Sequence, residues 1–298
     1  MNLQFGSVET TSSALLGAAR REALLSLLDD RSAAVRQALL AYFAELGPHA
    51  APFLREVAHG RNRVLGRHAA WYLGELKFSD PIAEFSSFIR SLNYELETGA
   101  LLLARTITPQ LDVGRCCYAL DSMATRCREL FAEPSSVREK CRVLNRVLFH
   151  EWGFRGNAEH STDARNSLLD QVINRRKGSP LALVIIYLLT AERLGLDLEP
   201  VGLGGNFYVG SYGGDDIFFV DVFDQGVLRD APEVFHLLQS KQLHPKPSDL
   251  APMPVREVLT RNCRQLASQC AAGSEPDRSK MFAGFVEEFE AAYTRNLT

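Results

Sequence analysis

The sequence has no run of apolar residues long enough to cross a membrane as a helix. Its central apolar run, Leu181–Leu189, is far shorter than the ~20 residues that a bilayer requires, and the charged residues Glu192 and Arg193 follow it. A strong excess of one charge is also missing, because the net charge is −3 over 298 residues and the basic side chains are scattered. These absences argue against a membrane protein and against a general nucleic-acid binder.

Cysteine pairs and metal-binding patterns are absent too. No CxxC motif and no histidine at metal-ligand spacing accompanies the six cysteines, Cys116, Cys117, Cys127, Cys141, Cys263 and Cys270. His59 and His68 lack acidic neighbours at ligand spacing, and HEW at His150 lacks the second histidine of a zinc-protease motif. The first ten residues show no basic segment before an apolar core. We therefore expect no cofactor, no metal, no signal peptide and a reducing cytoplasm.

The strongest local pattern is a central helix. Ser179 is a good N-cap, Pro180 fits the first helical turn, where its missing N–H costs nothing, and Gly195 can end the helix. The residues in the run 181–189 are apolar on all sides of the helix rather than along one stripe. Such a helix is buried on most of its faces, so we expect it inside a globular domain.

Three short segments rich in β-branched and aromatic residues follow this helix, namely LEPVGL, NFYVGSY and DIFFVDVF. Residues 213–216 supply turn chemistry between the last two, which predicts an antiparallel hairpin beside the helix. If Gly214-Asp215 is a two-residue turn, Tyr208 faces Asp221 across the hairpin, and Asn206 lies diagonally from Asp221 on the same face.

Residues 10 to about 78 show helical patterns in pairs that repeat after about thirty residues. The matching positions are Leu24 with Leu54, Leu27 with Val57, Tyr42 with Tyr72, and Glu45-Leu46 with Glu75-Leu76. This spacing predicts two HEAT-like repeats, although a generic helical bundle would space its leucines similarly. Because each pair leaves an apolar face open, two repeats should lean on the following domain or on a partner.

The composition changes at Asp80-Pro81, where further helical patterns begin. Four helices are expected before the central one, with breaks at Thr108-Pro109 and Glu133-Pro134, and two more follow a proline-rich stretch near the C-terminus. The predicted organisation is HEAT-like repeats at 1–78, a core with its own helical layer at 79–240, a Pro-rich linker at 241–254 and a helical tail at 255–298.

Several motifs in a fixed order resemble the SirB-type branch of the transglutaminase-like superfamily. They are GFRGN at Gly153, RNSLLDQVINRRKGSP at Arg165, Leu-Gly-Leu after the central helix, GGNF at Gly204 and FVDVFDQG at Phe219. The similarity spans about Thr98 to Arg261. It implies an α+β fold, in which a papain-like core of a buried central helix and antiparallel strands follows the α-helical HEAT-like region.

The resemblance also implies that two of three catalytic residues are missing. Active members of the superfamily carry a Cys at the start of the central helix, a His on the strand after Gly-Gly and an Asp on the next strand. Here Ser179-Pro180 occupies the Cys position, Asn206 the His position, and only Asp221 matches. Proline has no nucleophile, and Asn cannot exchange a proton near neutral pH. We expect the geometry of the triad without its chemistry.

Polar residues that lead to the central helix form a second group of candidates. Together with Tyr208, they could line a cleft above the helix N-terminus, which attracts anions; they are Arg155, Asn157, Arg165, Asn166, Arg175 and Arg176. The alternative is that the asparagines are turn and cap residues, while the arginines bind carboxylates such as Asp163 and Asp170. Ser179 and Asp221 have plain alternatives as well, as an N-cap hydroxyl and as an acceptor of turn hydrogen bonds.

The sequence therefore predicts a degenerate transglutaminase-like protein that acts as a binding or regulatory module for a protein or peptide partner. Catalysis needs a nucleophile together with its base, and neither position is retained. One alternative is a hydrolase or acyl transferase with a rearranged set, in which Ser179, Cys116 or Cys117 is the nucleophile. Another is a scaffold that acts through the HEAT-like repeats. A basic or aromatic exposed stripe on the repeats, or a cleft closed over Asn206, would favour the scaffold.

Overall fold

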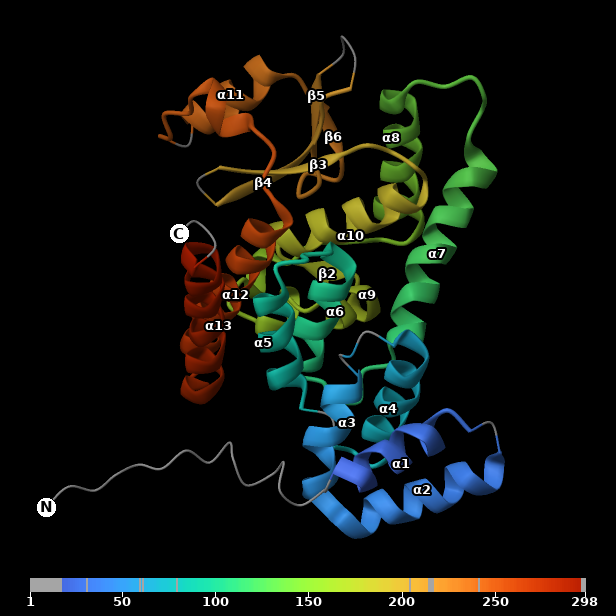
Figure 1. Ribbon diagram of the computed structural model, residues 1–298. Helices are drawn as coiled ribbons and strands as arrows, with labels where there is room; N and C mark the ends of the chain where they lie inside the picture. The colour runs from blue at the N-terminus through green and yellow to red at the C-terminus, as the bar shows by residue number, and fades with distance from the viewer. Residues whose placement is uncertain are drawn as a thin grey trace, which may run out of the picture. The chain divides into compact units, whose positions relative to one another are not determined.

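The structure is a computed structural model that describes residues 18–30, 32–58, 60, 62–78, 80–203, 205–213, 217–240 and 242–295. The chain divides into two compact units, one up to Asp80 and one from Pro81 onward (Figure 1). The N-terminal ten residues, His59, Gly204 and the predicted turn at Gly214-Asp215 lie outside the described residues.

The secondary structure described in the first unit consists of helices and turns. Its elements are α1 (Ala18–Leu28), α2 (Ala33–Leu46), the 3-10 turn η2 (Gly47–Ala50), α3 (Ala51–Ala58) and α4 (Arg63–Glu75). Asn62 caps α4, because its side chain accepts hydrogen bonds from the backbone N–H groups of Val64 and Leu65. Phe43 and Leu54 are fully buried in the core that the helices share.

The predicted thirty-residue repeat pairs residues that should be equally buried. One pair meets this expectation and another does not. Leu24 and Leu54 are both buried, whereas Leu27 is 41% exposed and its counterpart Val57 is half-buried. Paired helices are thus present, and their assignment to the HEAT class stays a prediction.

The second unit begins with the helical layer expected from the sequence. Its helices are α5 (Pro81–Ser91), α6 (Leu96–Arg105), α7 (Val113–Leu130) and α8 (Val137–Asn145). The segment that follows was not predicted in this detail. It consists of the π-helical turn η3 (Arg146–Glu151), strand β1 (Arg155–Gly156), the 3-10 turns η4 (Ala158–His160) and η5 (Ala164–Asn166), helix α9 (Leu169–Arg175) and strand β2 (Lys177–Gly178). The two short strands pair in parallel.

The central helix α10 (Pro180–Arg193) confirms the sequence prediction in each detail. The Ser179 hydroxyl accepts a hydrogen bond from the N–H of Ala182 at 3.2 Å, and Pro180 is the first helical residue. Gly195 has a φ of +68°, the left-handed conformation that glycine adopts without strain. All residues in the stretch 181–191 are buried, so α10 forms the centre of the largest core cluster.

An antiparallel sheet covers one side of α10 (Figure 1). Its strands follow chain order: β3 (Glu199–Leu203), β4 (Asn206–Ser211), β5 (Phe218–Asp221) and β6 (Val227–Arg229). The hairpin of β4 and β5 was predicted, whereas β6 was not. Val209 pairs with Val220, and the same register continued by one pair places Tyr208 opposite Asp221, as predicted.

The C-terminal elements pack against this unit. They are α11 (Ala231–Ser240), the 3-10 turn η6 (Pro247–Leu250), α12 (Val255–Ala272) and α13 (Pro276–Arg295). Helix α13 lies beside α12 and α5 (Figure 1), where the rings of Phe85 and Phe285 meet edge to face at 4.8 Å. The proline-rich stretch lies beside β3, because the N–H of Met253 donates to the carbonyl of Pro200 at 2.7 Å. The predicted tail thus shares a core with the helical layer.

No helix among the residues described has the combination of length and apolar character that spanning a membrane requires.

Candidate functional site

A cavity of about 390 Å³ opens where the N-terminus of α10 meets β4, β5 and α11; we call it the central cleft. It is lined by Pro180, Gly205, Asn206, Phe207, Tyr208, Asp221, Phe223, Asp224, Arg229 and Leu237. Four of the candidate positions, Pro180, Asn206, Tyr208 and Asp221, therefore come together. The cleft is open, so side chains do not close it over Asn206.

Asp221 is held by neighbours on both of its carboxylate oxygens. Its Oδ2 lies 3.3 Å from Nε of Arg229, and its Oδ1 accepts the N–H of Asp224 at 3.1 Å. The same arginine donates to the carboxylate of Asp224 at 2.7 Å. Asp221 is only 8% exposed, so the arginine offsets a buried negative charge. Its partner is thus an arginine, where a triad would place a histidine.

Sequence reasoning missed Arg229, although a signal for it exists. Strand β6 has only three residues, too few to show an alternating pattern. Its pairing places Arg229 opposite Phe219 and Val227 opposite Asp221, which brings the guanidinium to the carboxylate. A basic residue eight positions after Asp221, across a tight turn, could have suggested an ion pair.

Asn206 and Tyr208 offer no base at neutral pH. The side-chain amide of Asn206 donates to the carbonyl of Leu203 at 3.4 Å. Burial, reinforced by the charge of Asp221, raises the pKa of Tyr208 to about 12. The phenol therefore stays protonated and can serve only as a hydrogen-bond donor or a neutral acceptor.

Ser179 lies beside the cleft but not among its lining residues. Its hydroxyl accepts the N–H of Ala182, and the hydroxyl of Ser167 lies 3.4 Å away. Only 5% of Ser179 is exposed. The structure thus places Ser179 as a buried N-cap, while Pro180 faces the cleft.

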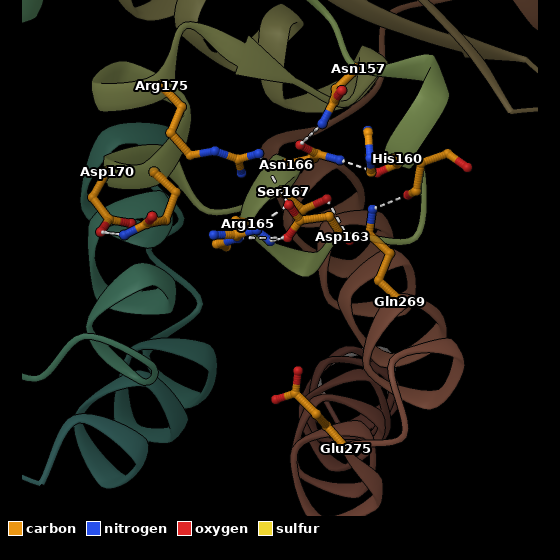
Figure 2. Close-up of polar contacts among 12 residues, drawn as sticks. Asn157, His160, Asp163, Arg165, Asn166, Ser167, Asp170, Arg175, Gln269 and Glu275 are labelled. Atoms are coloured by element: carbon orange, nitrogen blue, oxygen red, sulfur yellow. Dashed lines mark hydrogen bonds and ion pairs between the residues drawn. The ribbon is translucent and has the colours of Figure 1, made fainter.

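The segment before α10 forms a hydrogen-bonded network of its own (Figure 2). Asn157 donates to the side-chain oxygen of Asn166 at 2.9 Å, and Asn166 donates to the carbonyl of His160 at 2.7 Å. Asp163 binds Arg165 at 2.9 Å and Arg175 at 3.1 Å. Burial alone would raise the pKa of Asp163, but the two arginines outweigh it and lower that pKa. The asparagines and these arginines therefore support the loop.

Helix α12 completes this network. Ser167 donates to the side-chain oxygen of Gln269 at 2.9 Å, and Gln269 donates to the carbonyl of Ser161 at 2.9 Å (Figure 2). Asn262 donates to the carbonyl of Ser167 at 3.1 Å. These contacts join residues about a hundred positions apart, and they fix the loop that precedes the N-cap of α10.

Arg155 and Arg176 lie away from the central cleft. The N–H of Arg155 donates to the carbonyl of Arg176, and its side chain is exposed. Arg176 has a φ of 57°, and its guanidinium stands 5.4 Å from the ring centre of Trp152. Of the arginines proposed for the cleft, none is among its lining residues.

The cysteines considered as alternative nucleophiles lie elsewhere as well. Cys116 is buried, and burial together with the charge of Asp170 raises its pKa to about 11. Cys117 donates to a carboxylate oxygen of Glu97 at 3.3 Å; burial and this contact raise its pKa. Within the described ranges, no Cys or Ser side chain hydrogen-bonds to a histidine ring, and no group of three His, Cys, Asp or Glu could hold a metal ion. A thiolate nucleophile therefore has no support at either cysteine.

Part of the chain is similar in sequence to known proteins. Residues 115–264 match the family model described as the transglutaminase-like superfamily. A UPF0162 protein of Xylella fastidiosa is 34% identical over 190 residues, which cover 62% of this chain and 68% of that protein. For a UPF0162 protein of Vibrio cholerae the identity is 27% over 147 residues, 49% of this chain and 53% of that protein. F-box only protein 21 of Mus musculus is 31% identical over 134 residues, 42% of this chain and 21% of that protein. No solved structure matches.

Proposed function

Because the chain belongs to the transglutaminase-like superfamily, we propose that it is a degenerate member of it, a binding or regulatory module whose central cleft holds a peptide segment without reacting with it. One observation carries the proposal: Pro180, Asn206 and Asp221 line a single open cavity. By the resemblance to the superfamily, Pro180 stands at the place of the nucleophile and Asn206 at the place of the base. Both residues line the cavity, and neither has the required chemistry. We further propose the SirB-type branch, on the ordered motifs from Gly153 to Phe219.

The lining of the cleft suits an extended peptide. Phe207 and Phe223 offer apolar surface, and Phe223 is 39% exposed. The Asp224 side chain is 61% exposed and can accept a hydrogen bond, while the first turn of α10 contributes positive potential near Pro180. A volume of about 390 Å³ is within the usual range for a ligand pocket, at the small end.

A peptide selection with a matched pair of variants tests this function. A random peptide library displayed on phage is selected against the full chain, and the enriched peptides are measured by fluorescence anisotropy. Leu237→Arg places a long charged side chain in the cleft from the half-buried face of α11, while Gln239→Arg adds the same charge to an exposed position of that helix. We expect Leu237→Arg to weaken peptide binding at least tenfold and Gln239→Arg to leave it unchanged. Equal binding by both variants would contradict the proposal.

The absence of catalysis is tested separately. The wild-type chain is incubated with amide and ester substrates and with the selected peptides, and products are followed by mass spectrometry. We expect no turnover and no covalent adduct on a cleft residue. An acyl-enzyme on any residue that lines the cleft would show that the protein is an enzyme.

A scaffold function through the first unit is a second candidate, favoured by one specific feature. A cavity of about 270 Å³ is lined by Leu28, Asp30, Arg36, His68, Trp71 and Tyr72. Trp71 is 41% exposed, and the guanidinium of Arg36 stands 5.9 Å from its ring centre. This is the exposed aromatic and basic surface expected of a scaffold. The selected peptides distinguish the two functions. If the first unit is the binding site, Trp71→Ala should abolish peptide binding and Leu237→Arg should leave it unchanged.

A further inference from the structure

The charged side chains that line the central cleft are two aspartates and one arginine, so the lining carries one more negative than positive charge. Asp221 is buried, and both of its carboxylate oxygens have partners, in Asp224 and Arg229. The side chain of Asp224 is 61% exposed and pairs with Arg229 through Oδ2. Its other oxygen, Oδ1, accepts no hydrogen bond from a residue in the described ranges. The excess negative charge therefore lies on a side chain that a ligand in the cleft can reach.

The same cleft offers an anionic group little to bind. Arg229 already donates to both aspartates, at 3.3 and 2.7 Å, so an acidic ligand group would have to displace a carboxylate from it. At the start of α10, Pro180 has no N–H. The side chain and the carbonyl of Ser179 already accept the N–H groups of Ala182 and Leu183. Neither the arginine nor the helix start is therefore a ready anion site.

Two aromatic rings line the cleft together with Asp224. Phe223, its neighbour in the chain, is partly exposed, and Phe207 also faces the cavity. The ring of Phe223 lies directly on the backbone of Gly156, where an added Cβ would stand 2.2 Å from Cε2 of the ring. The absence of a side chain at Gly156 thus leaves the room that this ring occupies. Aromatic rings pack on the methylene stem of a basic side chain and attract its positive charge.

We propose that the central cleft selects a peptide segment with a basic side chain, lysine or arginine, and that Asp224 sets this preference. The basic group pairs with Oδ1 of Asp224, while its methylene stem packs against Phe223. An uncharged side chain would leave the excess negative charge of the cleft without a partner, and an acidic side chain would be repelled by it. This inference rests on the proposed peptide-binding function and adds the chemistry of the side chain that is bound.

Four pools of fluorescent peptides test the preference on the full chain by anisotropy. Each pool holds acetylated and amidated heptapeptides with random uncharged residues around a fixed central lysine, arginine, norleucine or glutamate. We expect the lysine and arginine pools to bind about tenfold more tightly than the norleucine pool, because norleucine forms neither the ion pair nor the cation–π contact. The glutamate pool should bind most weakly. Equal binding of the lysine and norleucine pools would overturn the inference.

Two variants assign the preference to Asp224. Asp224→Asn should weaken binding of the lysine and arginine pools about fivefold at low salt, and less at high salt. It should also strengthen binding of the glutamate pool, because Arg229 then keeps only one carboxylate partner. Glu192→Gln changes the net charge equally at an exposed position of α10 outside the cleft, and it should bind as the wild type does. An unchanged order of the four pools in Asp224→Asn would overturn the inference.

The outcomes also separate this inference from the proposed function. If the norleucine pool binds as tightly as the lysine pool and Leu237→Arg weakens the binding of both, the cleft holds peptides and only the basic preference is wrong. If no pool binds, or if Leu237→Arg leaves the binding of every pool unchanged, the peptide-binding function of the cleft and the preference are both wrong.

Discussion

The substitution Pro180→Cys tests whether residue 180 has the position at which active members of the superfamily carry their nucleophilic cysteine. Residue 180 is the first of the 14 residues of α10, and it lines the cleft. The positive end of a helix dipole favours a thiolate, and thiols at helix N-termini have pKa values of roughly 3.5 to 7.5. The native thiols differ, because burial raises the pKa of Cys116 and Cys141 to about 11 and that of Cys127 to about 12.

The expected difference in reactivity follows from these pKa values. At pH 7 a thiol of pKa about 7.5 is roughly one quarter ionised, and a thiol of pKa about 11 is ionised to about one part in 10⁴. Intrinsic nucleophilicity falls with pKa with a Brønsted slope of about 0.4–0.5, which removes roughly 1.6 powers of ten. With a pKa of about 7.5, the new thiol should therefore be alkylated about 50-fold faster than the buried native thiols.

Iodoacetamide labelling, followed by peptide mapping over a range of pH, measures these rates. Glu192→Cys is the matched control, since it places an exposed thiol at the opposite end of α10, where the dipole raises a thiol pKa. We expect the pH profile of Pro180→Cys to lie at least about one pH unit below that of the control. If the order is reversed, residue 180 does not occupy the place of the superfamily's nucleophile.

Three further predictions concern stability. The hydrogen bond from Arg193 lowers the pKa of Glu97, so this group stabilises the fold above its unfolded pKa and loses that effect as pH falls through its lower folded pKa. Urea unfolding of Glu97→Gln should show a loss of about 2 kcal/mol at pH 7 that shrinks at pH 3, and a constant difference would contradict this. Ser179→Ala should cost about 1 kcal/mol and leave peptide binding intact; loss of binding would give Ser179 a functional role. Asp170→Asn should unfold at the same or a higher urea concentration, with a gain of up to about 1 kcal/mol, because Oδ1 of the buried Asp170 carboxylate accepts no hydrogen bond from a described residue.

The parts of the fold that the sequence predicts are those with strong local signals. Ser179, Pro180 and Gly195 fix both ends of α10 through capping and backbone preferences alone. Helix α12 likewise begins at residue 255, where the predicted helical tail begins. Strands β1 and β2 have two residues each and β6 has three, so their existence depends on tertiary pairing rather than on a repeating pattern.

The candidate site likewise has features that the sequence predicts and features that it does not. The positions of Asn206 and Asp221 relative to each other follow from strand register, which turn chemistry can predict. The contact between Ser167 and Gln269 spans 102 residues, and no local pattern encodes it. Whether Oδ1 of Asp170 finds a hydrogen-bond donor depends on which side chains pack around α9, and only the folded structure shows this.

The absence of a basic side chain at position 206 fits the presence of Arg229 beside Asp221. With Asn at 206, the buried carboxylate of Asp221 would lack a cation, and Arg229 at 3.3 Å provides it. Introducing His at 206 would place an imidazole beside a carboxylate that is already engaged by a guanidinium, and the nearby positive charge would lower the pKa of that imidazole. Pro180→Cys with Asn206→His should therefore show less hydrolysis than the triple variant that adds Arg229→Gln, since only the triple variant frees Asp221 to orient the histidine. Equal hydrolysis by the double and triple variants would mean that Arg229 does not compete for Asp221.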